Sequence, residues 1–593
     1  MKKDYRFWLV DTVLIFICAA LLYLGFAFLR PLANPDEGRY AEIPREMIAG
    51  GDYVTPRLNG LPYFYKPPLF YWLQCASLKA FGINRTSVRL ASSLMAVLGV
   101  CLTYAAARSL YGRRAGLFAA FILATTPLYC VIGLIVTLDM AVSVFMSGAM
   151  FAFIVAIKKS GIWRSVLIVA FFVFCSLAVM TKGIIGILIP CAVAFLYVVS
   201  GGIASIKNFF SIMGRREWLC VCLGILAFFA IAAPWHILAA IANPSAEGVP
   251  LLTKDETGQG FFWYYFIHEH FLRYIDPETS MRAQPFWFFL AIAPAGFLPW
   301  LFFLPRVAKN AVSGGAVDAR DCRDSFKYMA IWVLFIVLFF SVSSSKLVPY
   351  ITAVYPALAF IVGVWAARAW DNLGNFDAKA EKWIMVVLGF VAAIALVVAF
   401  FILKRKPIED EVIFAGWFSA FGTFFVMAGI SAAALAAALR GRLRLFWAIT
   451  AAGVAALIAS ININAALAQR MSSEKIAAQI KAQRSGEPLA IAFDYGYFQD
   501  LPVWLGEVPM LVGEPPTEQY FGWQREKDRH SGRIFADAAQ LRAFLEKNKK
   551  LWIVIKDRDI ALLKEYNLPL EMREKARSKH IGVFEISLKD EKK

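Results

Sequence analysis

Residues 7–29 read FWLVDTVLIFICAALLYLGFAFL, an apolar run that follows the basic residues Lys2, Lys3 and Arg6. A run of this length can cross a bilayer core of roughly 30 Å, whereas the apolar part of a cleaved signal peptide has only about 7 to 15 residues. We therefore predict a retained membrane-spanning helix. Further apolar runs of roughly 18 to 25 residues recur along the chain, so the sequence predicts an integral membrane protein.

The composition agrees with this class. The 593 residues are 59% hydrophobic and 18% charged, whereas a soluble domain carries about 25% charged residues. The net charge of +18 would raise nucleic-acid binding in a soluble protein. Cytoplasmic loops of membrane proteins collect Lys and Arg, so we attribute the charge to topology and to contacts with membrane lipids, and we expect no nucleic-acid partner. The cysteines show no metal-ligand spacing.

About 13 membrane spans are predicted, each bounded to within about 2 to 4 residues. Short basic connections alternate with two longer loops, 30–89 and 241–285, which are rich in aromatic, proline and acidic residues. The positive-inside rule places the basic connections and the N-terminus in the cytoplasm, and the two long loops outside. The spans are expected to begin near Phe7, Leu90, Ala115, Ile132, Trp163, Ile184, Trp218, Phe286, Tyr328, Leu347, Trp383, Val412 and Leu445.

The chain changes character near residue 465. Residues 1–464 hold the predicted spans, whereas residues 465–593 are rich in both acidic and basic side chains. A helix is expected over Asp559–Tyr566. Short β-like runs occur at Pro488–Phe493, Leu551–Ile555 and Ile581–Ile586. Strands that alternate with helices in this way predict a small water-soluble α/β domain.

The first external loop opens with two adjacent carboxylates, Asp36 and Glu37, followed by Arg39 and Tyr40. One interpretation is an ordinary helix start, because acidic residues favour the first helical turn. The other is functional, because acidic residues at a membrane boundary that face a cavity often take part in function.

Lys66 lies in the same loop, directly before Pro67 and Pro68 and after Tyr63 and Tyr65. The two prolines fix the backbone and bias Lys66 toward an extended conformation. A lysine on such a rigid turn is well suited to bind one phosphate. The alternative is an interfacial anchor, in which the aromatic rings lie among lipid headgroups and the lysine reaches toward water.

The second external loop contains His268, Glu269, His270 and Arg273. On a helix the first three side chains do not share one face, and zinc needs about three or four convergent ligands, so we expect no metal site here. The sequence requires no cofactor and leaves a divalent metal ion open. Arg273 is the better candidate for a functional residue in this loop, because a guanidinium can bind a phosphate through two hydrogen bonds.

Further polar residues lie at the expected external ends of spans. They are Asp139, Lys182 in Thr181-Lys182-Gly183, and Lys346 and Tyr350 in the segment 343–350. Each one alone fits ordinary interface polarity, but their shared placement on one side favours a functional interpretation.

At these residues the chain resembles the lipid A aminoarabinose transferases, which belong to the protein mannosyltransferase-like group with the GT-C fold. The resemblance covers nearly the whole chain and is most specific at Asn34–Glu42, Lys66–Leu69, His268–Arg273 and Ser345–Tyr350. It implies a polytopic α-helical membrane protein of the bacterial inner membrane, with the active site and the C-terminal domain facing the periplasm.

The resemblance also implies a reaction. Members transfer 4-amino-4-deoxy-L-arabinose, with inversion, from undecaprenyl phosphate to a lipid A phosphate, which lowers the negative charge of the outer membrane and gives resistance to polymyxin and cationic peptides. Asp36 looks like the key acidic residue of the family, and Lys66 and Arg273 look like its carrier-phosphate ligands. Tyr40, Tyr63, Asp139, His268 and Tyr350 resemble cavity positions. Family members often have Glu directly before the lysine, where this chain has Tyr65.

The chemistry of the candidates fits this reaction. Lys66 and Arg273 can stabilise the charge that develops on a departing polyprenyl phosphate. Asp36 can act as general base toward a hydroxyl acceptor, or orient a phosphate acceptor that is already anionic. The ammonium of an aminosugar favours nearby acids. The catalytic candidates are therefore Asp36, Glu37 and Asp139, and Arg39, Tyr65 and Lys346 join the candidates for substrate binding.

Three alternatives remain at the level of sequence. Tyr65 keeps open a related lipid-linked glycosyltransferase that uses another sugar, or a protein or glycan acceptor. A transporter for lipid-linked sugars would place its polar residues near the bilayer midplane, whereas those of this chain gather at one interface. A purely structural membrane scaffold would leave Lys66 and the external acids unexplained.

Overall fold

The computed structural model describes residues 2–25, 27–28, 30–250, 258–272, 284–298, 300–305, 307–308, 319–371, 472–578 and 580–589. The expected spans near Trp383, Val412 and Leu445, and the candidate Arg273, lie outside these residues. The chain divides into two compact units. The first comprises Met1–Arg30, Arg89–Pro234 and His270–Ala468, and the second comprises Pro31–Val88, Trp235–Glu269 and Gln469–Lys593.

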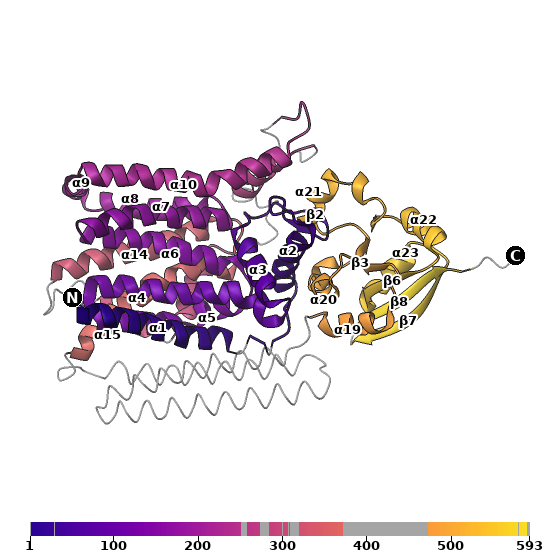
Figure 1. The fold of residues 1–593 in the computed structure, drawn as a ribbon, viewed down its shortest axis with the longest axis horizontal. Helices are drawn as coiled ribbons and strands as arrows, with labels where there is room; N and C mark the ends of the chain where they lie inside the picture. Colours follow the sequence, from indigo (N-terminus) through magenta and orange to yellow (C-terminus); the bar gives the residue numbers. More distant parts are fainter. Residues whose placement is uncertain are drawn as a thin grey trace, which may run out of the picture. The chain divides into compact units, whose positions relative to one another are not determined.

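Helices build the first unit, and those that run through it lie side by side in Figure 1. Helix α6 packs against both α7 and α8. The helices that lie in this unit or enter it are α1 (Lys2–Leu24), α4 (Arg85–Ala124), α5 (Pro127–Leu134), α6 (Leu138–Lys158), α7 (Ile162–Lys182), α8 (Ile185–Val199), α9 (Gly202–Ser211), α10 (Arg215–Ala242), η1 (Trp263–Leu272), α12 (Phe288–Gly296), η2 (Trp300–Phe303), α14 (Ala319–Val342), η3 (Val348–Val354) and α15 (Tyr355–Asp371).

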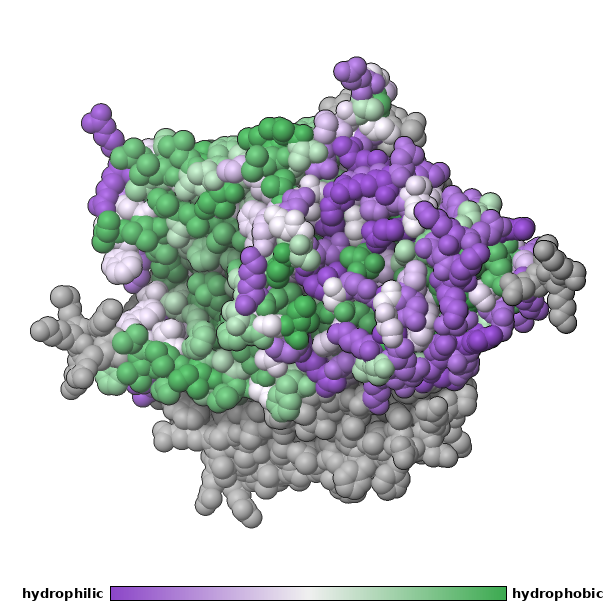
Figure 2. Space-filling model, turned by 45° about the vertical axis from the view of Figure 1, so that its right-hand side comes forward, coloured by the Kyte–Doolittle hydropathy of each residue, from purple (hydrophilic) through white to green (hydrophobic). Residues whose placement is uncertain are grey.

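These helices confirm the membrane class. Within the described residues, seven helices are long and apolar enough to cross a membrane, and the bent pair α8 and α9 would make an eighth. Helices suit this environment because they satisfy their own backbone hydrogen bonds where no water is present. Figure 2 shows apolar side chains gathered over the helices of the first unit and hydrophilic ones over the C-terminal α/β segment.

Three span boundaries differ from the prediction. The spans expected from Leu90 and Ala115 meet within α4 at a break at Gly112, whose φ of 85° favours glycine. The span expected from Ile132 begins at Leu138, because the side chain of Thr137 accepts a hydrogen bond from the first turn and so caps α6. The helix expected from Phe286 is the nine-residue α12, which contains Pro294 and ends at Gly296.

The second unit joins the loop 30–89 to the C-terminal segment. The loop forms α2 (Asp36–Gly50), β1 (Arg57–Leu58), β2 (Leu61–Pro62) and α3 (Leu69–Phe81). The C-terminal segment forms α19 (Glu474–Gln483), β3 (Leu489–Ala492), η6 (Tyr495–Phe498), α20 (Leu501–Leu505), β4 (Met510–Val512), α21 (Thr517–Arg525), η7 (Asp528–His530), β5 (Ile534–Phe535), α22 (Ala538–Asn548), β6 (Leu551–Lys556), η8 (Asp557–Asp559), α23 (Ile560–Glu565), β7 (Leu570–Ser578) and β8 (Ile581–Leu588).

The C-terminal strands form a mixed sheet in the order β5-β4-β3-β6-β8-β7. The neighbouring strands β5, β4, β3 and β6 pair in parallel. Strand β8 runs antiparallel to both β6 and β7. The three β-like runs of the sequence are confirmed as β3, β6 and β8, and the expected helix is confirmed as α23. Every residue of β3 and β6 is buried, which explains why these strands read as continuous apolar runs.

A buried carboxylate ties the loop to the C-terminal segment inside the second unit. The side chain of Asp500 accepts hydrogen bonds from Asn34 Nδ2 at 2.5 Å, Ser472 Oγ at 2.8 Å and the backbone N–H of Ser473 at 2.9 Å. The backbone N–H of Asp500 donates in return to Asn34 Oδ1 at 2.9 Å. Burial raises the pKa of Asp500, although these donors lower it. The residues just before α2 are thereby fixed to the C-terminal segment.

A second link joins β1 to the chain after α21. Arg57 donates two hydrogen bonds to the carboxylate of Glu526, at 2.8 and 3.1 Å. His530 Nε2 lies 3.2 Å from Glu526 Oε2. Burial raises the pKa of Glu526, but the hydrogen bonds from His530 and Arg57 outweigh this effect and lower it to about 2. The charged form of Glu526 therefore stabilises the folded unit.

Glu526→Gln should lower the free energy of unfolding by about 2 kcal/mol at neutral pH, a value discounted from the full pKa shift because the pair is partly exposed. A carboxyl group whose pKa is lowered in the folded state stabilises the fold at pH values above its usual pKa. This stabilisation is lost as the pH falls toward the lowered pKa. The difference from the unmodified protein should therefore shrink between pH 5 and pH 2. Thermal unfolding of the intact protein in detergent measures it.

The matched control is Glu546→Gln, because Glu546 pairs with Arg542 on the exposed face of α22. We expect a change within about 0.5 kcal/mol for this control. An equal loss of stability in the two variants, or a difference independent of pH, would contradict a role for the charge of Glu526.

Candidate active site

Asp36 and Glu37 open α2, as the helix-start interpretation expects, but their environments differ. The side chain of Asp36 is 65% exposed. Glu37 is buried, and its Oε2 accepts a hydrogen bond from the backbone N–H of Ala33 at 2.9 Å. Glu37 therefore stabilises the turn that leads into the helix, whereas the carboxylate of Asp36 is accessible to a substrate.

Arg39 fixes a positive charge beside Asp36. Its guanidinium is buried, donates to Glu518 Oε1 at 2.5 Å and to Gln499 Oε1 at 3.1 Å, and lies 3.9 Å from the carboxylate of Asp36. Burial lowers the pKa of Arg39, but the neighbouring Tyr63, Glu518 and Asp36 raise it above its usual value. Arg39 is thus a permanent cation that is held by the C-terminal segment.

Stacked aromatic rings connect this end of α2 to Lys66. The hydroxyl of Tyr63 accepts a hydrogen bond from Arg39 at 3.4 Å, and its ring stacks on Tyr65 with centroids 4.9 Å apart. Tyr65 in turn meets the edge of Tyr264 at 5.7 Å. Tyr40 stacks separately on Tyr71 at 6.2 Å. Tyr65, which stands where the resemblance favours Glu, therefore has a packing role.

Lys66 lies on the turn that Pro67 and Pro68 fix ahead of α3, and it pairs with an acid from the second external loop. Its Nζ lies 3.3 Å from Glu269 Oε2, and the side chains of Lys66 and Glu269 are 22% and 1% exposed. His268 Nδ1 lies 3.6 Å from the other oxygen of Glu269, and its ring stacks on Tyr264 at 4.9 Å. A buried carboxylate thus holds the ammonium on one side, and part of the lysine side chain stays accessible.

The first unit contains a separate polar group. Asp139 lies in the first turn of α6, where its Oδ2 accepts a hydrogen bond from Thr137 Oγ1 at 3.0 Å, and its Oδ1 forms an ion pair with Lys182 at the end of α7. The Asp139 and Lys182 side chains are about nine-tenths buried. The ammonium of Lys182 also lies over the ring of Tyr350, 4.0 Å from its centroid. These three residues form one charged and aromatic group.

Lys346 and His270 contact backbone atoms. Lys346 Nζ donates to the carbonyl oxygens of Ser343 at 2.5 Å and Gln284 at 3.0 Å, and burial lowers the pKa of its ammonium. His270 Nε2 accepts a hydrogen bond from the backbone N–H of Ile184 at 3.3 Å. Both side chains therefore hold loops of the first unit together.

The candidates of the sequence analysis thus fall into two groups. Asp36, Glu37, Arg39, Tyr40, Tyr63, Tyr65, Lys66 and His268 lie in the second unit. Asp139, Lys346 and Tyr350 lie in the first unit. Within the described parts of the chain, no group of three or more His, Cys, Asp or Glu side chains is placed to hold a metal ion.

Two ion-pair partners were not identified from the sequence. The pairing of Glu269 with Lys66 spans two distant loops and has no local signal. The pairing of Lys182 with Asp139 has one. Helices α6 and α7 each have 21 residues and are joined by a short turn at Gly161, so the first turn of α6 must meet the last turn of α7.

A family profile matches residues 65–236 and describes dolichyl-phosphate-mannose-protein mannosyltransferases. The matched segment includes Lys66, Asp139 and Lys182. It covers less than a third of the chain, so relatives that match a larger share of the chain carry more weight.

Curated relatives extend the similarity. The undecaprenyl phosphate-alpha-4-amino-4-deoxy-L-arabinose arabinosyl transferase of Aeromonas hydrophila is 30% identical over 419 residues, which cover 67% of this chain and 70% of the relative. A transferase of the same name from Proteus mirabilis is 29% identical, with 68% and 67% covered. The crystal structure of ArnT from Cupriavidus metallidurans bound to undecaprenyl phosphate matches with a TM-score of 0.78 and 28% identity, and 97% of each chain is covered.

The buried pair of Asp139 and Lys182 predicts a strong coupling. Lys182→Met leaves a buried carboxylate without its ammonium, and Asp139→Asn leaves the ammonium without its carboxylate. Each change should lower the free energy of unfolding by about 3 to 5 kcal/mol. The double variant should lose less than the sum of the two, with a coupling above about 1 kcal/mol. Thermal unfolding in detergent measures all three variants.

Lys158→Met is the control, because Lys158 pairs at 3.3 Å with Asp324, whose side chain is 56% exposed. This substitution should change the free energy of unfolding by less than about 0.5 kcal/mol. Strict additivity of the two single variants would show that Asp139 and Lys182 do not stabilise one another.

Proposed function

The chain belongs to the undecaprenyl phosphate-alpha-4-amino-4-deoxy-L-arabinose arabinosyl transferases, and from this premise we propose that it transfers the aminosugar to a phosphate group of lipid A. It is a multi-span membrane glycosyltransferase of the GT-C type that uses an undecaprenyl phosphate-linked donor. The acceptor, the orientation in the membrane and the roles of individual residues are parts of the proposal.

The observation that carries the proposed mechanism is the pairing of Lys66 with Glu269. A rigid turn presents the ammonium, a buried carboxylate holds it from one side, and 22% of the lysine side chain stays accessible. A phosphate that approaches the accessible side meets a cation that is already positioned. Such fixed charges stabilise a developing charge because they need not reorganise during the reaction.

The proposed reaction breaks the bond between the anomeric carbon of the sugar and an oxygen of the carrier phosphate. The bonding electrons leave with that oxygen, and Lys66 stabilises the charge that they add. An oxygen of the lipid A phosphate forms the new bond from the opposite face, which inverts the anomeric carbon. The acceptor is an anion at neutral pH, so the step needs no proton transfer to a base.

Asp36 has a different proposed role. Its carboxylate is exposed at the start of α2, and Arg39 lies 3.9 Å away. Since the phosphate acceptor needs no deprotonation, we assign to Asp36 the stabilisation of positive charge on the aminosugar, both at its ammonium and at the anomeric carbon in the transition state. We do not assign this role to Glu37, because it is buried and accepts a hydrogen bond from the backbone N–H of Ala33.

The proposed setting follows from the charge of the loops. Basic connections place one end of the spans in the cytoplasm of a bacterial inner membrane, and the loop that carries Asp36 and Lys66 faces the periplasm. There the enzyme would meet lipid A in the outer leaflet. An aminosugar attached to a lipid A phosphate would lower its negative charge and add an ammonium, and so reduce the binding of polymyxin and other cationic peptides.

Lys66→Ala should lower kcat/KM for transfer by at least about 30-fold, because the leaving phosphate loses a charged hydrogen-bond partner worth about 2 to 5 kcal/mol. The measurement is transfer from undecaprenyl phosphate-aminoarabinose to lipid A by the purified protein in detergent. Lys79→Ala is the control, since Lys79 lies on α3 in the same loop and contacts the ring of Tyr53. Equal activity of the two variants would refute the phosphate-binding role of Lys66.

Asp36→Asn should lower kcat by at least about 100-fold with little change in the thermal unfolding midpoint, because the exposed carboxylate acts mainly in the transition state. Near-normal turnover of this variant would remove Asp36 from the mechanism.

The acceptor is tested in cells. A strain that lacks aminoarabinose transfer and receives this gene should gain lipid A species heavier by one aminoarabinose residue, as seen by mass spectrometry. The Asp36→Asn gene should not restore them. Unmodified lipid A together with sugar on a protein or another glycan would favour the alternative acceptor, whereas a lipid A adduct of different mass would identify another sugar.

A further inference from the structure

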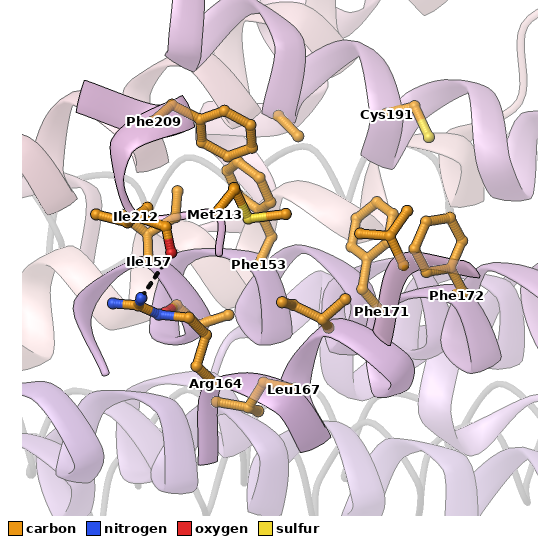
Figure 3. A pocket seen from close by; sticks show the side chains of 14 residues that line it. Phe153, Ile157, Arg164, Leu167, Phe171, Phe172, Cys191, Phe209, Ile212 and Met213 are labelled. Carbon is orange, nitrogen blue, oxygen red and sulfur yellow. Dashed lines mark hydrogen bonds between the residues drawn. The ribbon is translucent and has the colours of Figure 1, made fainter. Parts of the chain in front are cut away.

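A second site lies in the first unit, at the ends of α6 and α7 far from Asp139 and Lys182. A cavity of about 230 Å³ opens there among α6, α7, α8, α9 and α10 (Figure 3). Asp139 begins α6 and Lys182 ends α7, whereas the cavity is lined by the last turns of α6 and the first half of α7. It is therefore distinct from the candidate active-site residues of this unit.

The walls of the cavity are almost entirely apolar. Four phenylalanines, Phe153, Phe171, Phe172 and Phe209, line it together with Leu167 and Met213 (Figure 3). Apart from Arg164, such a lining offers no side-chain hydrogen bonds to a sugar or a nucleotide. A hydrocarbon chain is the ligand that fits it, because apolar walls in a membrane protein exchange one apolar neighbour for another at little cost.

Arg164 is the one charged side chain among the described residues that line the cavity. Its Nε donates to the carbonyl oxygen of Lys159 at 2.8 Å, and its Nη1 donates to that of Ile212 at 2.9 Å (Figure 3). Among the described residues, Arg164 has no ion-pair partner, and its Nη2 has no hydrogen-bond acceptor. The backbone thus holds a full positive charge at the cavity without neutralising it.

Further basic residues surround this end of the helices. Lys207 on α9 and Arg215 and Arg216 at the start of α10 are exposed. Helix α9 is bent by 113° from α8, and its Ile203 and Phe210 are 74% and 53% exposed. A short helix that turns away from a span and combines exposed apolar side chains with lysine is typical of the headgroup layer of a membrane. From these residues we expect the cavity to lie at the level of the lipid phosphates.

We propose that this cavity binds an anionic phospholipid, with one acyl chain between α7 and α9 and the phosphate at Arg164. The apolar walls select a lipid. The guanidinium of Arg164, which has no acidic partner among the described residues, and the exposed basic residues together select a negative headgroup. By the positive-inside rule this end of the spans lies at the cytoplasmic leaflet. The bound lipid would join the ends of α6 and α7 to the bend between α8 and α9.

Photo-crosslinking tests the site on the full-length protein in lipid nanodiscs. Phosphatidylglycerol with a diazirine on its acyl chain should label the residues that line the cavity, as mapped by mass spectrometry of peptides. Phosphatidylcholine with the same chain should label them at least about fivefold less. Unlabelled phosphatidylglycerol should compete, and unlabelled phosphatidylcholine should not.

Ala194→Phe fills the cavity, because Ala194 is buried in its wall, and it should remove this labelling. Ala230→Phe makes the same change on the exposed side of α10 and should leave labelling intact. Arg164→Gln should reduce the preference for phosphatidylglycerol and retain labelling of the cavity by both lipids.

Two results would overturn the proposal. Equal labelling of the unmodified protein by the two lipids would show unspecific lipid contact, and this readout depends on no variant. Competition by undecaprenyl phosphate that is stronger than competition by phosphatidylglycerol would assign the cavity to the carrier lipid instead.

Discussion

A buried charge must be compensated, and this requirement organises the polar residues of the protein. The carboxylate of Glu269 is almost fully buried, and burying an ion costs several kcal/mol unless a partner of opposite charge and hydrogen bonds offset it. Lys66 supplies the charge at 3.3 Å. Pro67 and Pro68 restrict the backbone of the turn that carries Lys66, and the ion pair holds its flexible side chain. The same contact that stabilises Glu269 therefore aims the ammonium.

The first unit meets the same requirement in two places. Asp139 pairs with Lys182, and the ammonium of Lys182 also faces the ring of Tyr350. In α1, Asp11 interrupts the apolar run that predicts the first span, and it accepts hydrogen bonds from Arg108 and Arg113. Asp139 and Asp11 thus each meet a basic residue of another helix segment. Arg164 differs from these residues, since its described partners are carbonyl oxygens, and this difference is what points to a ligand.

The sequence predicts those features that the solvent imposes. Lipid demands long apolar helices, so the spans are visible as runs, and the buried strands β3, β6 and β8 are visible for the same reason. The boundaries of the helices depend on single residues, such as Thr137, whose side chain caps α6, and Gly112, whose φ is positive. The periodicity of the sequence does not resolve these boundaries. Strands β4 and β5 have only three and two residues, too few for a pattern. The candidate residues Asp36 and Lys66 could be found because prolines and charges cluster around them, whereas the role of Glu269 depends on a contact between residues 203 positions apart.

Charge balance around Lys66 also gives a reason for Tyr65. The resemblance favours glutamate at this position, but here a second carboxylate would stand beside a lysine that already pairs with Glu269. Two negative charges next to one cation would repel the phosphate that Lys66 is proposed to bind, because fields in a partly dry site are screened less than in water. Tyr65 avoids this repulsion, and its ring packs between Tyr63 and Tyr264 instead. In this chain the acid that pairs with the lysine is Glu269, which lies 203 positions away, and the residue before the lysine packs among aromatic rings.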